Sequence, residues 1–261
     1  MNKNLMMLLK TAASWTPAVP FAAGAKGVWY DPSDLATLFQ DSAGTIAVTA
    51  AGDPVGKMLD KSGLGYHLTQ SDSAKRPVLQ NDGANYYLSF DGFDDCLFTS
   101  AQVDLSATNE LTQVVGLRKT RNQNAEVVYE HSNAANWMAD GSCIFACTWT
   151  SGGDLEPGVC KTAYYQPSLP VGVAATAVVT QTAKISPSTQ ATWKNGSQAL
   201  SASNTLGTGN MRSAKLYVGL RAGPAFPFQG RLYQLAIWDR LSDSTTLAKI
   251  DAWCNSKTGA Y

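Results

Sequence analysis

The stretch Ala191-Thr192-Trp193-Lys194-Asn195-Gly196 gives the clearest structural signal in the chain. Thr and Trp favour extended strands, because their side chains pack well on a pleated surface. Asn and Gly tolerate positive φ angles, so an Asn-Gly pair that follows a strand favours a two-residue turn. The stretch therefore predicts one strand and the turn of an antiparallel β-hairpin.

Segments on both sides of this hairpin have the same character. They are short, rich in Val, Ile, Thr, Tyr and Trp, and separated by clusters of Gly, Asn, Pro and Asp. No helix is predicted between them, which argues against a parallel sheet with crossover helices. We therefore predict an all-β fold in which two antiparallel sheets form a sandwich. The expected strands are 86–90, 97–100, 111–118, 126–130, 143–148, 174–183, 190–194, 215–220 and 231–238.

Two short helices are expected to flank the strands. The first begins at Asp31-Pro32-Ser33-Asp34, where Asp31 can cap the helix and Pro32 suits its first position, and it ends at Gly44. The second is capped by Ser242 or Asp243 and stopped by Gly259. Apolar residues recur at helical spacing in both segments: Leu35, Leu38 and Phe39 in the first, and Leu247, Ile250, Trp253 and Cys254 in the second.

The charge balance limits the classes of partner. The 261 residues include 20 Lys+Arg and 20 Asp+Glu, so the formal net charge is zero. A chain without a basic surface is not expected to bind nucleic acid or an anionic membrane. Charged residues make up 15% of the chain, against a typical ~25%. A surface with few charges and many hydroxyl groups suits a protein that packs into a large assembly.

Five cysteines are present: Cys96, Cys143, Cys147, Cys160 and Cys254. The number is odd and too small for a disulfide scaffold. No second pair of Cys or His stands at the spacing of a zinc site. We expect all five to be small buried side chains in a protein that folds under reducing conditions.

Residues 1–26 are expected to form an arm. The first ten residues, Met1–Lys10, imitate a secretory signal, but the apolar run from Leu5 to Leu9 is shorter than the ~7–15 residues that such a signal needs. We therefore expect the arm to contact another chain during assembly. The expected organisation is the arm (1–26), a short helix with a connecting segment (27–56), and a sandwich with a C-terminal helix (57–261).

Several short motifs stand in a fixed order between about Asp60 and Trp253. They are Asp60–Gly63, Arg76–Leu79, Phe90–Leu97, Trp193–Gly196, Leu216–Gly219, Phe228–Leu232 and Ile237–Ser242. Together they resemble the laminin-G-like, concanavalin A-like family. The resemblance implies a jelly-roll sandwich, a fold found in both lectin-like binding modules and glycoside hydrolases.

A second resemblance concerns the segment Trp29–Leu35, which is similar to a stretch that precedes this domain in structural proteins of tailed bacteriophages. It implies a non-enzymatic virion protein, such as a tail, appendage or capsid decoration subunit, assembled in the bacterial host cytoplasm. Its partners would be other virion proteins and further copies of itself. Glycan binding at the host surface is compatible with that role, and a free-standing carbohydrate-binding module is the alternative.

A glycoside hydrolase is the less favoured alternative, because the sequence offers no suitable carboxylate pair. Glu126 and Glu130 lie four apart on an expected strand, so they share a face about 13 Å apart. Glycosidase carboxylates lie only about 5–9.5 Å apart. The two histidines, His67 and His131, stand in no nucleophile or zinc motif and are expected to be polar loop residues.

Two sets of residues are candidates for ligand contacts. Asp91, Asp94 and Asp95 form a dense acidic turn that can supply oxygen ligands to calcium, although Asp-Gly sequences also form ordinary turns. Aromatic side chains on loops can stack on sugar rings. The candidates for this role are Trp137, Trp149, Tyr164 and Tyr165.

Overall fold

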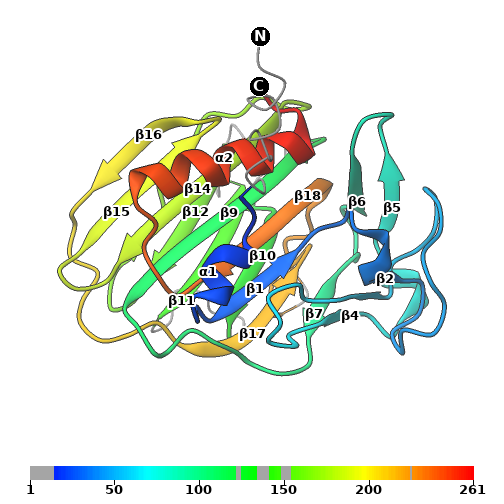
Figure 1. Ribbon diagram of the computed structural model, residues 1–261, viewed down its shortest axis with the longest axis horizontal. Coiled ribbons are helices and arrows are strands. Elements are labelled where there is room, and N and C mark those ends of the chain that lie inside the picture. The colour runs from blue at the N-terminus through cyan, green and yellow to red at the C-terminus, as the bar shows by residue number, and fades with distance from the viewer. Residues whose placement is uncertain (1–14, 122–124, 134–140, 148–153, 224) are drawn as a thin grey trace, which may run out of the picture.

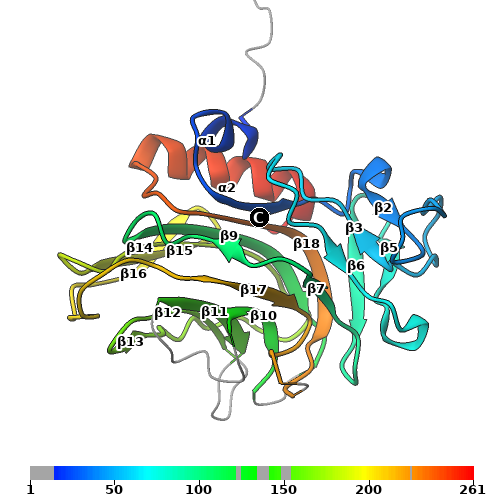
Figure 2. The ribbon, with the colours of Figure 1, turned by 90° about the horizontal axis from the view of Figure 1, so that it is seen from below.

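The computed structural model describes residues 15–121, 125–133, 141–147, 154–223 and 225–261. Within these ranges, two antiparallel sheets lie one above the other (Figure 2). The predicted all-β sandwich is confirmed, and its architecture is that of a jelly roll. The chain joins the sandwich already at Gly27, earlier than the expected start at residue 57.

The first sheet has eight strands: β1 (Gly27–Tyr30), β5 (Val78–Asn81), β6 (Tyr86–Asp91), β9 (Glu110–Lys119), β14 (Thr176–Lys184), β15 (Thr189–Lys194), β16 (Ser197–Ala202) and β18 (Gln229–Trp238). Their spatial order is β16-β15-β14-β9-β18-β6-β5, and β1 also pairs with β18. The predicted hairpin is the β15–β16 connection, where Asn195 and Gly196 have φ angles of 50° and 76°.

The second sheet has ten strands: β2 (Leu38–Phe39), β3 (Lys57–Met58), β4 (Leu68–Thr69), β7 (Leu97–Thr99), β8 (Val103–Asp104), β10 (Val127–Ser132), β11 (Ser142–Cys147), β12 (Leu155–Cys160), β13 (Tyr164–Tyr165) and β17 (Ser213–Val218). Their order is β13-β12-β11-β10-β17-β7-β4-β3-β2, with β8 paired to β17. A β-bulge interrupts the pairing of β10 with β11 between Val127 and Tyr129.

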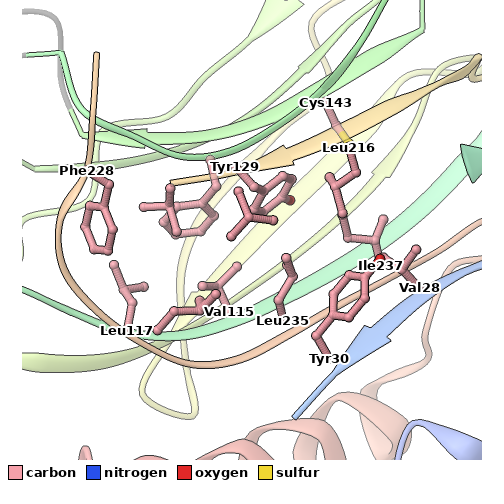
Figure 3. Close-up of a cluster of buried hydrophobic side chains, with 14 of the residues drawn as sticks. Val28, Tyr30, Val115, Leu117, Tyr129, Cys143, Leu216, Phe228, Leu235 and Ile237 are labelled. Atoms are coloured by element: carbon pink, nitrogen blue, oxygen red, sulfur yellow. The ribbon is translucent and has the colours of Figure 1, made fainter. Parts of the chain in front are cut away.

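Apolar side chains from both sheets meet between the layers (Figure 3). Because side chains alternate along a strand, each strand contributes every second residue to this core. Burial of one large apolar side chain contributes about 1.5–3 kcal/mol to stability. The side chains labelled in the figure are Val28, Tyr30, Val115, Leu117, Tyr129, Cys143, Leu216, Phe228, Leu235 and Ile237, all of them buried.

Helix α2 (Ser244–Thr258) covers the outer face of the first sheet (Figures 1 and 2). Of the two expected caps, Asp243 is used: its Oδ1 accepts a hydrogen bond from the Thr246 amide at 2.7 Å. Gly259 ends the helix in the left-handed conformation with φ 59°. The apolar stripe of α2 packs in a second core cluster with Trp29, Val114 and Trp238. The predicted C-terminal helix is therefore confirmed.

The predicted helix after Asp31 is wrong. Only the single 3₁₀ turn η1 (Leu35–Thr37) forms there, and Leu38 continues into β2. The Asp31 carboxylate accepts hydrogen bonds from the Ser33 amide at 3.0 Å and from Gln234 Nε2 at 2.6 Å, so it anchors the segment to the first sheet instead of capping a helix. Leu38 is fully buried in the core, so the segment is held against the sandwich as part of β2.

The described part of the expected arm packs against its own chain. Helix α1 (Ala18–Ala22) lies over the same face as α2 (Figure 2). The Trp15 ring contacts Trp253 edge-on at a centroid distance of 6.3 Å and lies 6.5 Å from Trp238. Phe21 contacts Trp238 edge-on at a centroid distance of 6.4 Å. Residues 15–26 are therefore not a free arm, and residues 1–14 lie outside the described ranges.

All five cysteines are buried and unpaired, as predicted. Burial raises the pKa of the Cys96 thiol to about 11 and that of the Cys147 thiol to about 12. Such thiols are protonated at neutral pH, so they pack as small apolar groups. In the part of the chain that the structure describes, no helix has the length and apolar character to span a membrane.

Candidate functional site

An aromatic pair lies on the outer face of the second sheet. Leu97, Leu216 and Val218 point into the core, so alternation turns Phe98 and Tyr217 to the outside. The two residues are direct cross-strand partners on β7 and β17. Their ring centroids are 6.2 Å apart with an interplanar angle of 32°, and both rings are half-buried. The pair therefore presents a tilted aromatic surface at the protein boundary.

Two hollows adjoin this surface, and Tyr217 borders both. We call them together the Tyr217 groove. The first hollow has a volume of about 250 Å³ and is lined by Gln70, Asp72, Lys75, Asp94, Cys96, Phe98, Tyr217, Leu220 and Ala222. The second has a volume of about 430 Å³ and is lined by Gln102, Ser132, Asn133, Lys215 and Tyr217. The second hollow is within the size range of small-molecule sites in proteins, roughly 300–1,000 Å³, and the first is slightly smaller.

Hydrogen bonds fix the polar wall of the first hollow. Gln70 is buried, and its Nε2 donates to the Cys96 carbonyl oxygen at 3.1 Å. Its Oε1 accepts a hydrogen bond from the Asp72 amide at 3.0 Å. Asp72 in turn caps η2 (Ser73–Lys75) through the Ala74 amide and pairs with Lys75 at 3.7 Å. The wall is therefore formed before any ligand arrives.

Ser213 orders the second hollow. Its hydroxyl donates to Gln102 Oε1 at 3.1 Å, and its carbonyl oxygen accepts from Asn133 Nδ2 at 3.1 Å. Glu130 lies directly opposite Tyr217 on the neighbouring strand. Burial raises the pKa of the Tyr217 hydroxyl, and the Glu130 charge adds to this shift. The phenol therefore stays neutral and can both donate and accept a hydrogen bond.

Glu126 and Glu130 are completely buried and cannot meet a substrate in solution. Glu126 accepts a hydrogen bond from Arg121 Nε, and Glu130 pairs with Arg221 Nε at 2.9 Å. Burial raises the pKa of the Glu126 carboxyl, and its bond with Arg121 opposes that shift. Both carboxylates hold the fold together around β10, and neither offers a general acid or base to a ligand.

His131 was expected to be a polar loop residue, and this expectation is wrong. It lies in β10 and is 1% exposed, and its Nε2 is 2.9 Å from the Val103 carbonyl oxygen. Burial lowers the pKa of the imidazole to about 4. The ring is therefore neutral at pH 7 and donates its Nε2 proton to Val103. His67, in contrast, is half-buried beside Tyr66, and its Nδ1 accepts a hydrogen bond from the Asp60 amide at 3.1 Å.

The aromatic residues proposed from the sequence do not form one surface. Trp137 and Trp149 lie outside the described residues. Tyr164 is 55% exposed on β13, on the same face as Tyr217, but β12, β11 and β10 separate the two strands. Tyr165 points the other way and packs against the core. The Phe98–Tyr217 pair was missed, because strands far apart in sequence bring it together.

The acidic turn uses two of its carboxylates to bind its own backbone. Asp95 is buried, and its Oδ2 accepts from the Asp91 amide at 2.9 Å. Asp91 Oδ1 accepts from the Phe93 amide at 2.8 Å, and Asp94 lines the Tyr217 groove. Burial raises the pKa of Asp95 to about 6. Among the described residues, no three His, Cys, Asp or Glu side chains converge on a point that could hold a metal. Calcium binding here remains a prediction.

A second acidic pair, Asp154 and Glu156, was not found from the sequence. Glu156 stands on the outer face of β12, opposite Ala146, and both carboxylates are half-buried. Burial raises the pKa of Glu156 to about 7, and the neighbouring Asp154 charge contributes. Asp154 accepts a hydrogen bond from the Ser168 hydroxyl at 2.8 Å. Strand β12 begins at Leu155, so Asp154 directly precedes the strand that carries Glu156.

Comparison with known proteins supports the fold. No family model and no curated protein matches the sequence. A GH54 α-L-arabinofuranosidase soaked with a cyclic sulfate inhibitor has a TM-score of 0.63 at 14% identity, and the match covers 94% of this chain and 66% of that one. Domain 4 of AbnA, a GH43 extracellular arabinanase from Geobacillus stearothermophilus in complex with arabinotriose, has a TM-score of 0.56 at 11% identity, over 86% of this chain and 97% of that one.

The botulinum neurotoxin serotype G binding domain is also similar, with a TM-score of 0.55 at 12% identity over 75% of this chain and 48% of that one. The chain therefore has a jelly-roll β-sandwich fold. At these identities the similarity establishes the arrangement of strands and no shared site.

Proposed function

We propose that this chain is a non-enzymatic carbohydrate-binding module and that the Tyr217 groove holds the sugar. The observation that carries the proposal is the half-buried Phe98–Tyr217 pair with polar side chains on both sides. A sugar ring has apolar C–H faces and a rim of hydroxyl groups. An aromatic floor with polar walls matches both parts. Domain 4 of AbnA, of similar fold, is described in complex with arabinotriose, which supports a sugar as ligand.

Replacing Tyr217 with alanine is expected to weaken oligosaccharide binding by at least about tenfold, because aromatic anchors at the centre of a site provide much of its affinity. An oligosaccharide array identifies the best ligand, and isothermal titration calorimetry then measures its Kd for wild type and Tyr217→Ala. Incubation of the same sugars with the wild-type protein is expected to release no reducing ends.

Two further variants make this test specific. Tyr261→Ala removes a tyrosine that is 56% exposed at the C-terminus and should leave binding unchanged. Tyr164→Ala examines the edge of the second sheet. Loss of binding in Tyr164→Ala with full binding in Tyr217→Ala would place the site near β13. Reducing ends that disappear in Glu156→Gln would show a glycoside hydrolase instead.

We also propose that the module belongs to a phage virion, since Trp29–Leu35 is similar to a segment of tailed-phage structural proteins. The protein is expected to sediment with purified particles at a fixed copy number, which quantitative mass spectrometry of the particles measures. Deletion of residues 1–14 should reduce incorporation, while Trp15 keeps its contacts with Trp238 and Trp253. A protein absent from particles would contradict this role and leave the sugar-binding proposal intact.

A further inference from the structure

The two hollows of the Tyr217 groove differ in charge. In the first, Asp72 and Asp94 accompany Lys75, and Asp72 pairs with Lys75 at 3.7 Å. In the second, Lys215 is the charged residue of the lining. Over the ranges that the structure describes, the Lys215 ammonium has no hydrogen bond or ion pair. The second hollow therefore carries a positive charge that no described residue neutralises.

The remaining lining of the second hollow supports this charge. Gln102 uses its Oε1 to accept from Ser213, so its Nε2 protons remain available to donate. The carboxylate of Glu130, which pairs across the strands with Tyr217, is buried against Arg221 at 2.9 Å and accepts a hydrogen bond from Ser132. Because Glu130 is already paired, it offsets little of the Lys215 charge. The hollow thus offers an ammonium and an amide donor side by side.

Lys215 and Tyr217 are two residues apart on β17 and point to the same side. Such neighbours lie about 6.6 Å apart. This separation is close to that of adjacent sugar rings in an oligosaccharide. A sugar chain that runs along β17 from a ring stacked on Tyr217 therefore has its next ring beside Lys215.

We propose that the second hollow binds an anionic substituent, a carboxylate or a sulfate, on the sugar next to the one that stacks on Tyr217. The inference rests on the proposed carbohydrate-binding function and adds the ligand class. A charge-assisted hydrogen bond from an ammonium to an anion is stronger than a bond between neutral groups. At a half-buried site this contact should favour an acidic sugar over its neutral form by about fivefold, and salt should reduce the preference.

The test uses an array of oligosaccharides in matched pairs. Each uronate is printed beside its methyl ester, and each sulfated sugar beside its desulfated form, so the two anions are distinguished. The best-bound pair is then titrated by calorimetry at low and high salt. Wild type should prefer the acidic member about fivefold, and Lys215→Gln should bind both members equally. Lys249→Gln, on the exposed face of α2, is the matched control and should keep the preference.

The outcomes separate the two proposals. Equal binding of acidic and neutral partners by wild type, or an unchanged preference in Lys215→Gln, overturns the anionic subsite and leaves the sugar-binding function in place. Absence of binding to every oligosaccharide overturns the proposed function and the subsite with it. A lost preference in Lys215→Gln with retained affinity for neutral sugars supports both.

Discussion

Arg121→Met is expected to lower the free energy of unfolding by about 3 kcal/mol, because it leaves a buried carboxylate without its cation. Glu126 is completely buried and accepts hydrogen bonds from Arg121 Nε and, at 3.1 Å, from the Gln229 amide. Arg121 also donates through Nη2 to the Pro227 carbonyl oxygen at 2.8 Å, and through Nη1 to that of Gly92 at 3.3 Å. One side chain thus ties β10 to the connections before β18 and after β6.

Urea denaturation followed by fluorescence measures the loss. Arg240→Met is a suitable control, since Arg240 is exposed and donates only to the Ala23 carbonyl oxygen in the described structure, and we expect a change within about 0.5 kcal/mol. Adding Glu126→Gln to Arg121→Met should restore part of the stability, because it removes the buried negative charge that has lost its arginine partner. A loss below about 1 kcal/mol in Arg121→Met would mean that Glu126 does not depend on this pair.

Acidification is expected to reduce stability through His131 by about 3 kcal/mol between pH 6.5 and pH 4. Burial lowers the imidazole pKa from 6.5 to about 4. Above pH 6.5 the ring is neutral in both the folded and the unfolded state, so His131 adds no pH dependence to the free energy of unfolding. As the pH falls, His131 becomes protonated in the unfolded chain before it does in the folded chain. The free energy of unfolding therefore decreases. Below about pH 4 both states are protonated and the loss stops.

Carboxyl groups whose pKa is raised by burial oppose this trend, so the contribution of His131 is obtained as a difference between wild type and a variant. The pKa is raised to about 6 for Asp95 and to about 7 for Glu156, and their contribution to stability grows as the pH falls. The free energy of unfolding is therefore measured against pH for wild type and His131→Gln. The variant should gain about 3 kcal/mol relative to wild type between pH 7 and pH 4. His67→Gln is the control: it removes the other histidine and leaves His131 in place, so its free energy of unfolding should still fall with pH as that of wild type does. Parallel curves for wild type and His131→Gln would refute a buried neutral ring.

Period-two patterns and turn residues were sufficient to predict the long strands. They located β6, β9, β14, β15 and β18, because each alternates in burial or is rich in β-branched residues. β12 was missed, because Pro157 and Gly158 are unusual in a strand. The strands β2, β3 and β4 have two residues each and leave no periodic signal. The false helix at Asp31 arose because a carboxylate near a proline suits a cap as well as a tertiary anchor.

The candidate site was much harder to predict than the fold. Phe98 and Tyr217 are neighbours only through the register of β7 against β17, which no local pattern encodes. Glu126, Glu130 and His131 all have polar side chains, and partners in the fold allow their burial. Glu126 pairs with the nearby Arg121, whereas the partners of Glu130 and His131, Arg221 and the Val103 carbonyl oxygen, are far away in the sequence. Residue type indicated which side chains are chemically able to act, and only the fold shows which of them meet solvent.

The contacts of Trp15 with α2 decide how the molecule can be attached to a surface. Trp15 contacts Trp253 of α2, and Asn255 of α2 donates a hydrogen bond to the Tyr261 carbonyl oxygen at 2.7 Å. Helix α2 covers the first sheet (Figure 2), whereas Tyr217 belongs to β17 of the second sheet. A biotin or fusion partner joined behind Tyr261 would sit at the back of the molecule. Immobilised in that way, the protein would turn its groove toward the solution and remain open to long polymeric ligands.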